Sequence, residues 1–139
     1  MLLLDTHVWI WALEGDARRL GPRTRRRLQR ALADESIQIS VASVFEITAL
    51  HTSGRLRLTL PADRWIDAGL IALRARLIDI SLAVALDAGR MARATLPDPM
   101  DRFIVATARD EGATLLTCDR AILEHARVSR GVRAEDAGA

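Results

Sequence analysis

The start of the chain constrains the fold more than any other stretch. Residues 2–4 are all leucine and run directly into Asp5. A short apolar run that ends in a carboxylate is typical of a buried strand with one charged side chain at its carboxyl end. We therefore expect Asp5 to stand at one edge of a central sheet, either as the N-cap of the next helix or as part of a site.

Strand patterns and helix patterns alternate along the rest of the chain. We expect strands at about residues 2–4, 37–41, 77–80 and 113–117, and helices at about residues 6–13, 22–33, 43–52, 61–73, 81–93, 100–111 and 119–124. This alternation favours an α/β fold with a central, mostly parallel sheet flanked by helices. With 139 residues, half of them apolar, the chain is expected to form one domain over residues 1–130, followed by a flexible C-terminal tail at 131–139.

The sequence also limits where the protein works. No apolar run approaches the roughly 18–20 residues that span a bilayer. The leucines at the start follow no basic region, and Asp5 comes too early for a signal peptide. The single cysteine, Cys118, cannot form an internal disulfide. We therefore expect a cytoplasmic protein that does not enter a membrane.

Every basic residue of the chain is an arginine, and their distribution is uneven. Seven arginines fall within thirteen residues, at positions 18, 19, 23, 25, 26, 27 and 30. Arginine side chains bind phosphates and carboxylates equally well. The cluster is therefore a solvated helix face, a contact to a nucleic-acid backbone or a docking site for an acidic partner.

The helix expected at residues 6–13 is apolar on every side. Trp9 and Trp11 are two positions apart, so they cannot both face the same core. Either the domain buries the whole helix, or one face of it contacts something else: a longer helix, a second subunit or a partner protein.

Four acidic residues are placed so that they can meet at one edge of the sheet, where sites of α/β proteins form. Asp5 and Asp119 each follow a strand, Glu46 lies one turn into the helix after the second strand, and Asp101 begins the helix before the last strand. Taken singly, each has an ordinary role at a helix start. For Glu46, that role is a capping box with Ser43.

Taken together, the carboxylates indicate a cation. Two carboxylates ~4 Å apart repel by about 4 kcal/mol at an effective dielectric constant near 20, so a cluster requires protons or a bound cation. Oxygen ligands without a cysteine–histidine spacing favour Mg²⁺ or Mn²⁺ over Zn²⁺. A hard cation on a few carboxylates is the equipment for phosphodiester hydrolysis.

Four segments in fixed order carry a resemblance to a known family. They are Leu3-Leu4-Asp5-Thr6-His7, Ser43-Val44-Phe45-Glu46-Ile47, Asp98-Pro99-Met100-Asp101-Arg102 and Leu116-Thr117-Cys118-Asp119. Their order and spacing resemble those of PIN-domain proteins, most closely the VapC toxins of bacterial toxin–antitoxin pairs, from residue 1 to about 125. Each segment alone is weak evidence, and the four together are specific.

The resemblance implies a metal-dependent endoribonuclease, the toxin component of a type II toxin–antitoxin pair. Such an enzyme hydrolyses RNA with a water that Mg²⁺ or Mn²⁺ activates. The implied partners are a VapB-like antitoxin, RNA and a second copy of the chain in a homodimer. Carried over by position, the metal-binding and catalytic residues are Asp5, Glu46, Asp101 and Asp119, and the groups that support them are Thr6, Asp98 and Thr117.

The chain departs from the family's sequence pattern at one place, and two other functions are alternatives. Related toxins often carry a histidine shortly before the Asp-Pro pair, where this chain has Leu96 and Pro97. A haloacid-dehalogenase-type phosphatase would need a second aspartate two residues after Asp5, where this chain has His7. The other alternative is a non-catalytic PIN-like binding module, in which the carboxylates cap helices and the tryptophan helix docks a partner protein.

Overall fold

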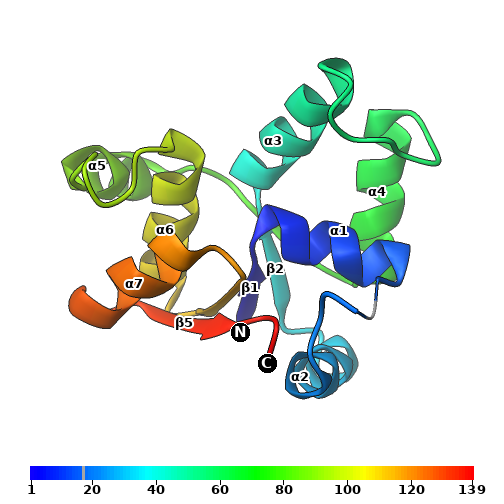
Figure 1. Ribbon diagram of the computed structural model, residues 1–139, viewed down its shortest axis with the longest axis horizontal. Coiled ribbons are helices and arrows are strands. Elements are labelled where there is room, and N and C mark those ends of the chain that lie inside the picture. Colours follow the sequence, from blue (N-terminus) through cyan, green and yellow to red (C-terminus); the bar gives the residue numbers. More distant parts are fainter. Residues whose placement is uncertain (17) are drawn as a thin grey trace.

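The central element is a parallel sheet. The structure, a computed structural model, describes residues 1–16 and 18–139. In this part of the chain five strands form one sheet in the order β3-β2-β1-β4-β5, and every neighbouring pair is parallel (Figure 1). The strands are β1 (Leu2–Leu4), β2 (Ile37–Ser40), β3 (Arg76–Ile78), β4 (Thr114–Thr117) and β5 (Arg133–Asp136).

Helices connect the strands and cover the sheet. They are α1 (Thr6–Glu14), α2 (Pro22–Ala33), α3 (Val41–Thr52), α4 (Ala62–Ala72), α5 (Leu82–Arg90), α6 (Pro99–Glu111) and α7 (Arg120–Val128). The predicted α/β class with a parallel sheet is confirmed. Most expected bounds are correct within three residues, but α7 continues to Val128, about one turn beyond the predicted end.

The two faces of the sheet are covered by two separate cores. Leu2 and Leu4 point to one face, where they pack with Trp9 of α1, and Leu3 points to the other, where it packs with Ile104 of α6. In Figure 1, α1, α2 and α4 lie on one side of the sheet and α5, α6 and α7 on the other. This alternation follows from the period of two along a strand, and it makes β1 buried on both faces.

The C-terminal segment differs from the expectation of a flexible tail at 131–139. Arg133–Asp136 forms β5 and pairs with β4 over four residues. Ala137 is fully buried, and its carbonyl oxygen accepts a hydrogen bond of 2.9 Å from the Gly21 amide. A flexible tail was expected because the residues of this segment are small and polar. The expectation was wrong because an edge strand is held by backbone hydrogen bonds, which side-chain hydrophobicity does not reveal.

The two tryptophans of α1 have different surroundings. Trp9 is fully buried and its ring centroid lies 5.4 Å from that of Trp65 on α4, at an interplanar angle of 56°. Trp11 is half-buried and lines two surface cavities. The side of α1 that stays available for contact with another molecule is therefore the side of Trp11.

Within residues 1–16 and 18–139, no helix has both the length and the apolar character needed to cross a bilayer.

Candidate active site

The site lies where the strand order changes direction. β1 is flanked by β2 on one side and β4 on the other, and ligands of α/β proteins bind outside the carboxyl ends of the strands at such a point. The carboxylate cavity, as we name it, occupies this position with a volume of about 340 Å³. Its described lining consists of Asp5, His7, Trp11, Glu46, Asp98, Asp101, Cys118 and Asp119.

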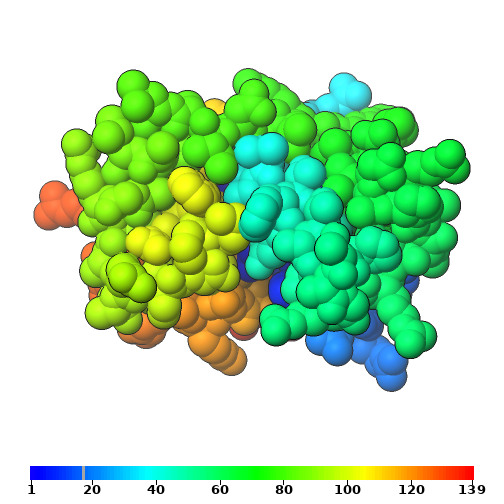
Figure 2. All heavy atoms as spheres, turned by 90° about the horizontal axis from the view of Figure 1, so that it is seen from above, coloured from blue at the N-terminus to red at the C-terminus, as the bar shows by residue number. Residues whose placement is uncertain are grey.

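The cavity collects acidic residues from four parts of the chain. Asp5 follows β1, Glu46 lies in α3, Asp98 and Asp101 lie at the start of α6, and Asp119 precedes α7. Figure 2 looks down on this face, where dark blue atoms from the start of the chain lie deep between α3 in cyan and the yellow start of α6. The sequence prediction that these carboxylates share one edge of the sheet is confirmed.

Asp5 forms the floor of the cavity and is held by two donors. Its side chain is only 7% exposed. Oδ1 accepts a 2.8 Å hydrogen bond from the Thr6 amide, and Oδ2 accepts one of 2.6 Å from the Thr117 hydroxyl. Burial raises the pKa of Asp5 above its usual value, although these two hydrogen bonds act in the opposite direction. Asp5 is thus both the N-cap of α1 and a fixed carboxylate of the cavity.

Glu46 is oriented by the same stretch. The Thr6 hydroxyl lies 2.5 Å from Glu46 Oε1 and 2.9 Å from the Ser43 hydroxyl. Because a carboxylate only accepts, Thr6 donates to Glu46, and Ser43 can then donate to Thr6. Burial raises the pKa of Glu46, and the charges of Asp5 and Asp98 raise it further.

The expected capping box of Ser43 and Glu46 was wrong. The N-cap of α3 is Ser40, whose hydroxyl accepts a 3.0 Å hydrogen bond from the Ala42 amide. Since α3 begins at Val41, Ser43 lies inside its first turn, and Glu46 faces the cavity instead of the helix start. Two serines three residues apart compete for the cap position in the sequence, and only the end of β2 decides between them.

Asp101 stands where the negative charges are most concentrated. Burial raises its pKa to about 7, together with the charges of Asp98, Asp119, Asp5 and Glu46 in that order. Every residue that perturbs Asp101 is itself acidic. The cavity therefore opposes ionisation of its own carboxylates.

Asp98 and Asp119 combine a structural role with their place in the cavity. Asp98 Oδ1 accepts from the Met100 amide at 2.9 Å and caps α6. Asp119 Oδ1 accepts from the Ile122 amide at 3.1 Å and caps α7. Each cap uses one oxygen of the carboxylate, and both residues line the cavity.

The chemistry of the lining fits a hard cation. The acidic groups offer oxygen ligands, which Mg²⁺ and Mn²⁺ prefer. A cation would also relieve the repulsion that, after burial, raises the pKa of Asp101. In the described part of the chain no three acidic, histidine or cysteine side chains already form a ligand set for a metal ion. A cavity of about 340 Å³ has room for the waters that Mg²⁺ usually keeps.

Three lining residues, His7, Trp11 and Cys118, were not among the site residues predicted from the sequence. One face of the helix that carries Trp11 was expected to contact a partner, and Cys118 was considered only for disulfides, yet Trp11 and Cys118 both line the cavity beside His7. Cys118 lies between Thr117 and Asp119, so its position next to two site residues is the signal that could have identified it. Trp11 lies one helical turn after His7, which brings it to the same face of α1.

A comparison with protein families gives the class of the fold and site. Residues 2–128 match the family model of the PIN domain. The chain belongs to the PIN-domain family, and the resemblance inferred from its four sequence segments is confirmed.

Individual relatives agree with this class. Ribonuclease VapC22 of Mycobacterium tuberculosis is 30% identical over 124 residues, which cover 89% of this chain and 91% of the relative. Two solved structures share the fold: VapBC2 from Rickettsia felis bound to a promoter DNA fragment, and DNA-bound VapBC from Salmonella typhimurium. The first matches with a TM-score of 0.69 and 18% identity over 97% of each chain. The second matches with a TM-score of 0.66 and 20% identity over 97% of this chain and 96% of the other.

Proposed function

We propose that this protein is a metal-dependent endoribonuclease and the toxin of a type II toxin–antitoxin pair. The observation that carries the proposal is the carboxylate cavity, in which burial, together with the charges of acidic residues from separate segments, raises the pKa of Asp101 to about 7. The similarity to Ribonuclease VapC22 supports RNA as the substrate.

Asp5, Glu46 and Asp101, assisted by Asp119, would hold Mg²⁺ or Mn²⁺. When bound, the cation would activate a water molecule, neutralise the phosphate and stabilise the departing oxyanion. Two threonines orient two of these carboxylates. Thr117 donates to Asp5 and Thr6 donates to Glu46.

Asp98 supports Asp101 instead of holding the cation itself. By capping α6 it fixes the first turn of the helix, in which Asp101 lies. Its own charge is the largest electrostatic contribution to the raised pKa of Asp101, so it strengthens the attraction of the cavity for a cation.

The proposed regulator is a VapB-like antitoxin. A basic antitoxin side chain that enters the carboxylate cavity would satisfy the same charges as the cation and would block access to them. We expect Glu46→Gln to weaken the complex, because it removes one of these charges. Unchanged affinity of the variant for the antitoxin would exclude this mode of inhibition.

A homodimer is also proposed. Phe45 of α3 and Leu82 of α5 are 63% and 78% exposed, so apolar surface is available for a second copy. The molar mass in solution, with and without both residues replaced by serine, tests this proposal.

The second candidate is a non-catalytic PIN-like binding module. It is favoured by the observation that Asp5, Asp98 and Asp119 all cap helices and therefore have a structural reason to be acidic. Titration calorimetry with Mg²⁺ and Mn²⁺ separates the two candidates, because the module needs no cation and the nuclease does.

The decisive experiment is RNA cleavage by Asp5→Asn. We expect this variant to lose metal-dependent cleavage while its circular dichroism stays that of the parent protein. The matched control is Asp67→Asn, at an exposed position on α4, which should cleave normally. Full activity of Asp5→Asn with Mg²⁺ or Mn²⁺ would contradict the assignment.

A further inference from the structure

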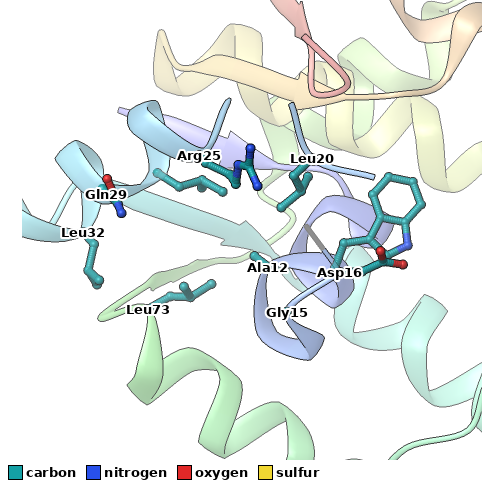
Figure 3. Close-up of a pocket in the computed structure, with 10 residues that line it drawn as sticks. Ala12, Gly15, Asp16, Leu20, Arg25, Gln29, Leu32 and Leu73 are labelled. Atoms are coloured by element: carbon teal, nitrogen blue, oxygen red, sulfur yellow. The ribbon is translucent and has the colours of Figure 1, made fainter. Parts of the chain in front are cut away.

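The carboxylate cavity is adjacent to a second cavity, and Trp11 lines both. This α1–α2 cavity has a volume of about 240 Å³. Figure 3 shows Leu20 and Arg25 along one side of it and Leu73 on the other. A molecule bound at the carboxylates can therefore continue past Trp11 towards α2.

The connecting surface carries aromatic and basic groups. The ring centroid of the exposed His7 lies 5.8 Å from that of Trp11. The guanidinium carbon of Arg19 lies 5.2 Å from the centroid of the Trp11 ring, within the range of a cation–π contact. The Arg19 side chain is 62% exposed, although it pairs with Asp16 at 3.1 Å. Nucleic-acid bases stack on surfaces of this composition.

Positive charge is concentrated in the segment that contains α2, at one end of this path. The segment 18–30 contains seven arginines and no acidic residue. The remaining chain has thirteen arginines and eighteen acidic residues, so it is net negative. Arg25 is exposed on α2 and lines the α1–α2 cavity.

A polyanion cannot be held by the carboxylate cavity alone, because the cavity repels phosphate. Proteins that bind single strands combine aromatic platforms with basic grooves, and basic residues supply most of the affinity. We propose that His7, Trp11, Arg19 and Arg25 form a strip that binds single-stranded RNA beyond the cleavage site. Bases stack on Trp11 and His7, and phosphates contact the arginines. The identity of the strand as RNA rests on the proposed function.

The test is binding of a labelled single-stranded oligouridylate in EDTA, where metal-dependent cleavage does not interfere. We expect Arg25→Ala to weaken binding about three- to tenfold and to reduce the salt dependence by about one phosphate contact. Arg90→Ala on α5 is the matched control, since it removes the same charge from an exposed position on the other side of the sheet. We expect its affinity to stay within twofold of the parent. Equal affinities of these two variants would overturn the strip.

Trp11 needs a pair of variants because it also packs against the core. Trp11→Leu keeps an apolar group without a stacking face, and we expect about tenfold weaker binding. Trp11→Phe should stay within threefold. The stacking role would be overturned if a folded Trp11→Leu variant bound the single-stranded oligomer with the affinity of the parent protein. It would also be overturned if the parent protein bound a duplex of the same length as tightly as the single strand.

The outcomes separate this inference from the proposed function. A parent protein that binds the oligomer through Arg25 and Trp11 but cleaves no RNA would contradict the nuclease and support the strip. Cleavage and binding at parental levels in Arg25→Ala and Trp11→Leu would contradict only the strip. If Arg25→Ala weakens an antitoxin complex and leaves RNA affinity unchanged, the surface serves a protein partner and the inference is wrong.

Discussion

Asp101 shows how a single residue reports the charge of the whole site. Its pKa of about 7 lies above that of an aspartate in an unfolded chain, so the folded protein holds a proton that the unfolded chain releases. Between about pH 4 and pH 7 the folded state binds more protons, and stability falls as the pH rises. Above pH 7 the folded state carries the full free-energy cost of an ionised Asp101.

We therefore expect Asp101→Asn to stabilise the protein at pH 8 in EDTA and to leave it nearly unchanged at pH 4. The gain should be about 1–2 kcal/mol, because solvent screening reduces the contribution of a half-buried group. Urea denaturation at both pH values, with Asp67→Asn as control, measures it. An equal gain at pH 4 and pH 8 would show that the pKa of Asp101 is not the cause.

Thr117 is the second residue whose role can be tested alone. Its hydroxyl donates to Asp5 and accepts a 3.0 Å hydrogen bond from the Asp119 amide. We expect Thr117→Val to lower Mn²⁺ affinity about 10- to 100-fold, because groups that orient ligands have effects of this size. Titration calorimetry is the measurement, and Thr117→Ser should restore binding. Failure of the serine variant to do so would assign the effect to packing.

At the scale of elements, the contact between α1 and α4 depends on a glycine. A Cβ at Gly69 would lie 2.6 Å from Leu13 Cδ1 and 3.2 Å from Trp9 Nε1, whereas a Cβ at Gly89 of α5 would have no heavy atom within 4 Å. The glycine in α4 is therefore a packing residue, and the one in α5 is not.

These two glycines form a matched pair for mutation. Gly89→Ala should stabilise the protein by about 0.5–1 kcal/mol through helix propensity. Gly69→Ala gains the same propensity but overpacks the helix contact, which costs about 1–3 kcal/mol, so it should be the less stable variant. Thermal denaturation of both gives the comparison. Equal melting temperatures would mean that Leu13 moves aside at no cost.

At the scale of the whole molecule, the C-terminus completes the sheet. β5 closes the edge beside β4, and the Ala137 carbonyl accepts from Gly21 just before α2. Val132 and Ala137 are buried. The last residues thus connect the sheet edge to the helix that carries the arginines.

Removal of residues 131–139 tests this role. We expect a loss of at least about 3 kcal/mol, because buried side chains and the β4–β5 hydrogen bonds are lost together. Denaturant unfolding of the shortened chain against the full chain measures it. Unchanged stability would show that β5 and the contacts of Ala137 do not contribute to the stability of the fold.

Features that depend on local sequence pattern could be predicted from the residues alone. Apolar runs, helix caps and glycine stops placed the strands and helices, and the position of Asp5, Asp101 and Asp119 relative to them placed these carboxylates at one edge of the sheet. These inferences succeed because, in a parallel sheet, the carboxyl ends of the strands and the amino ends of the connecting helices lie at the same edge, whatever the details of packing.

Other features depend on contacts between segments that are far apart in the chain, and they became visible only in the folded structure. The tertiary structure assigned the cap of α3 to Ser40, which released Ser43 and Glu46 to bond with Thr6. It placed Trp9 in the core and Trp11 between two cavities, and it made a strand from the polar residues of β5. Hydrogen bonds to a neighbouring strand and exposure at a cavity mouth depend on partners far away in the chain, so no local pattern records them.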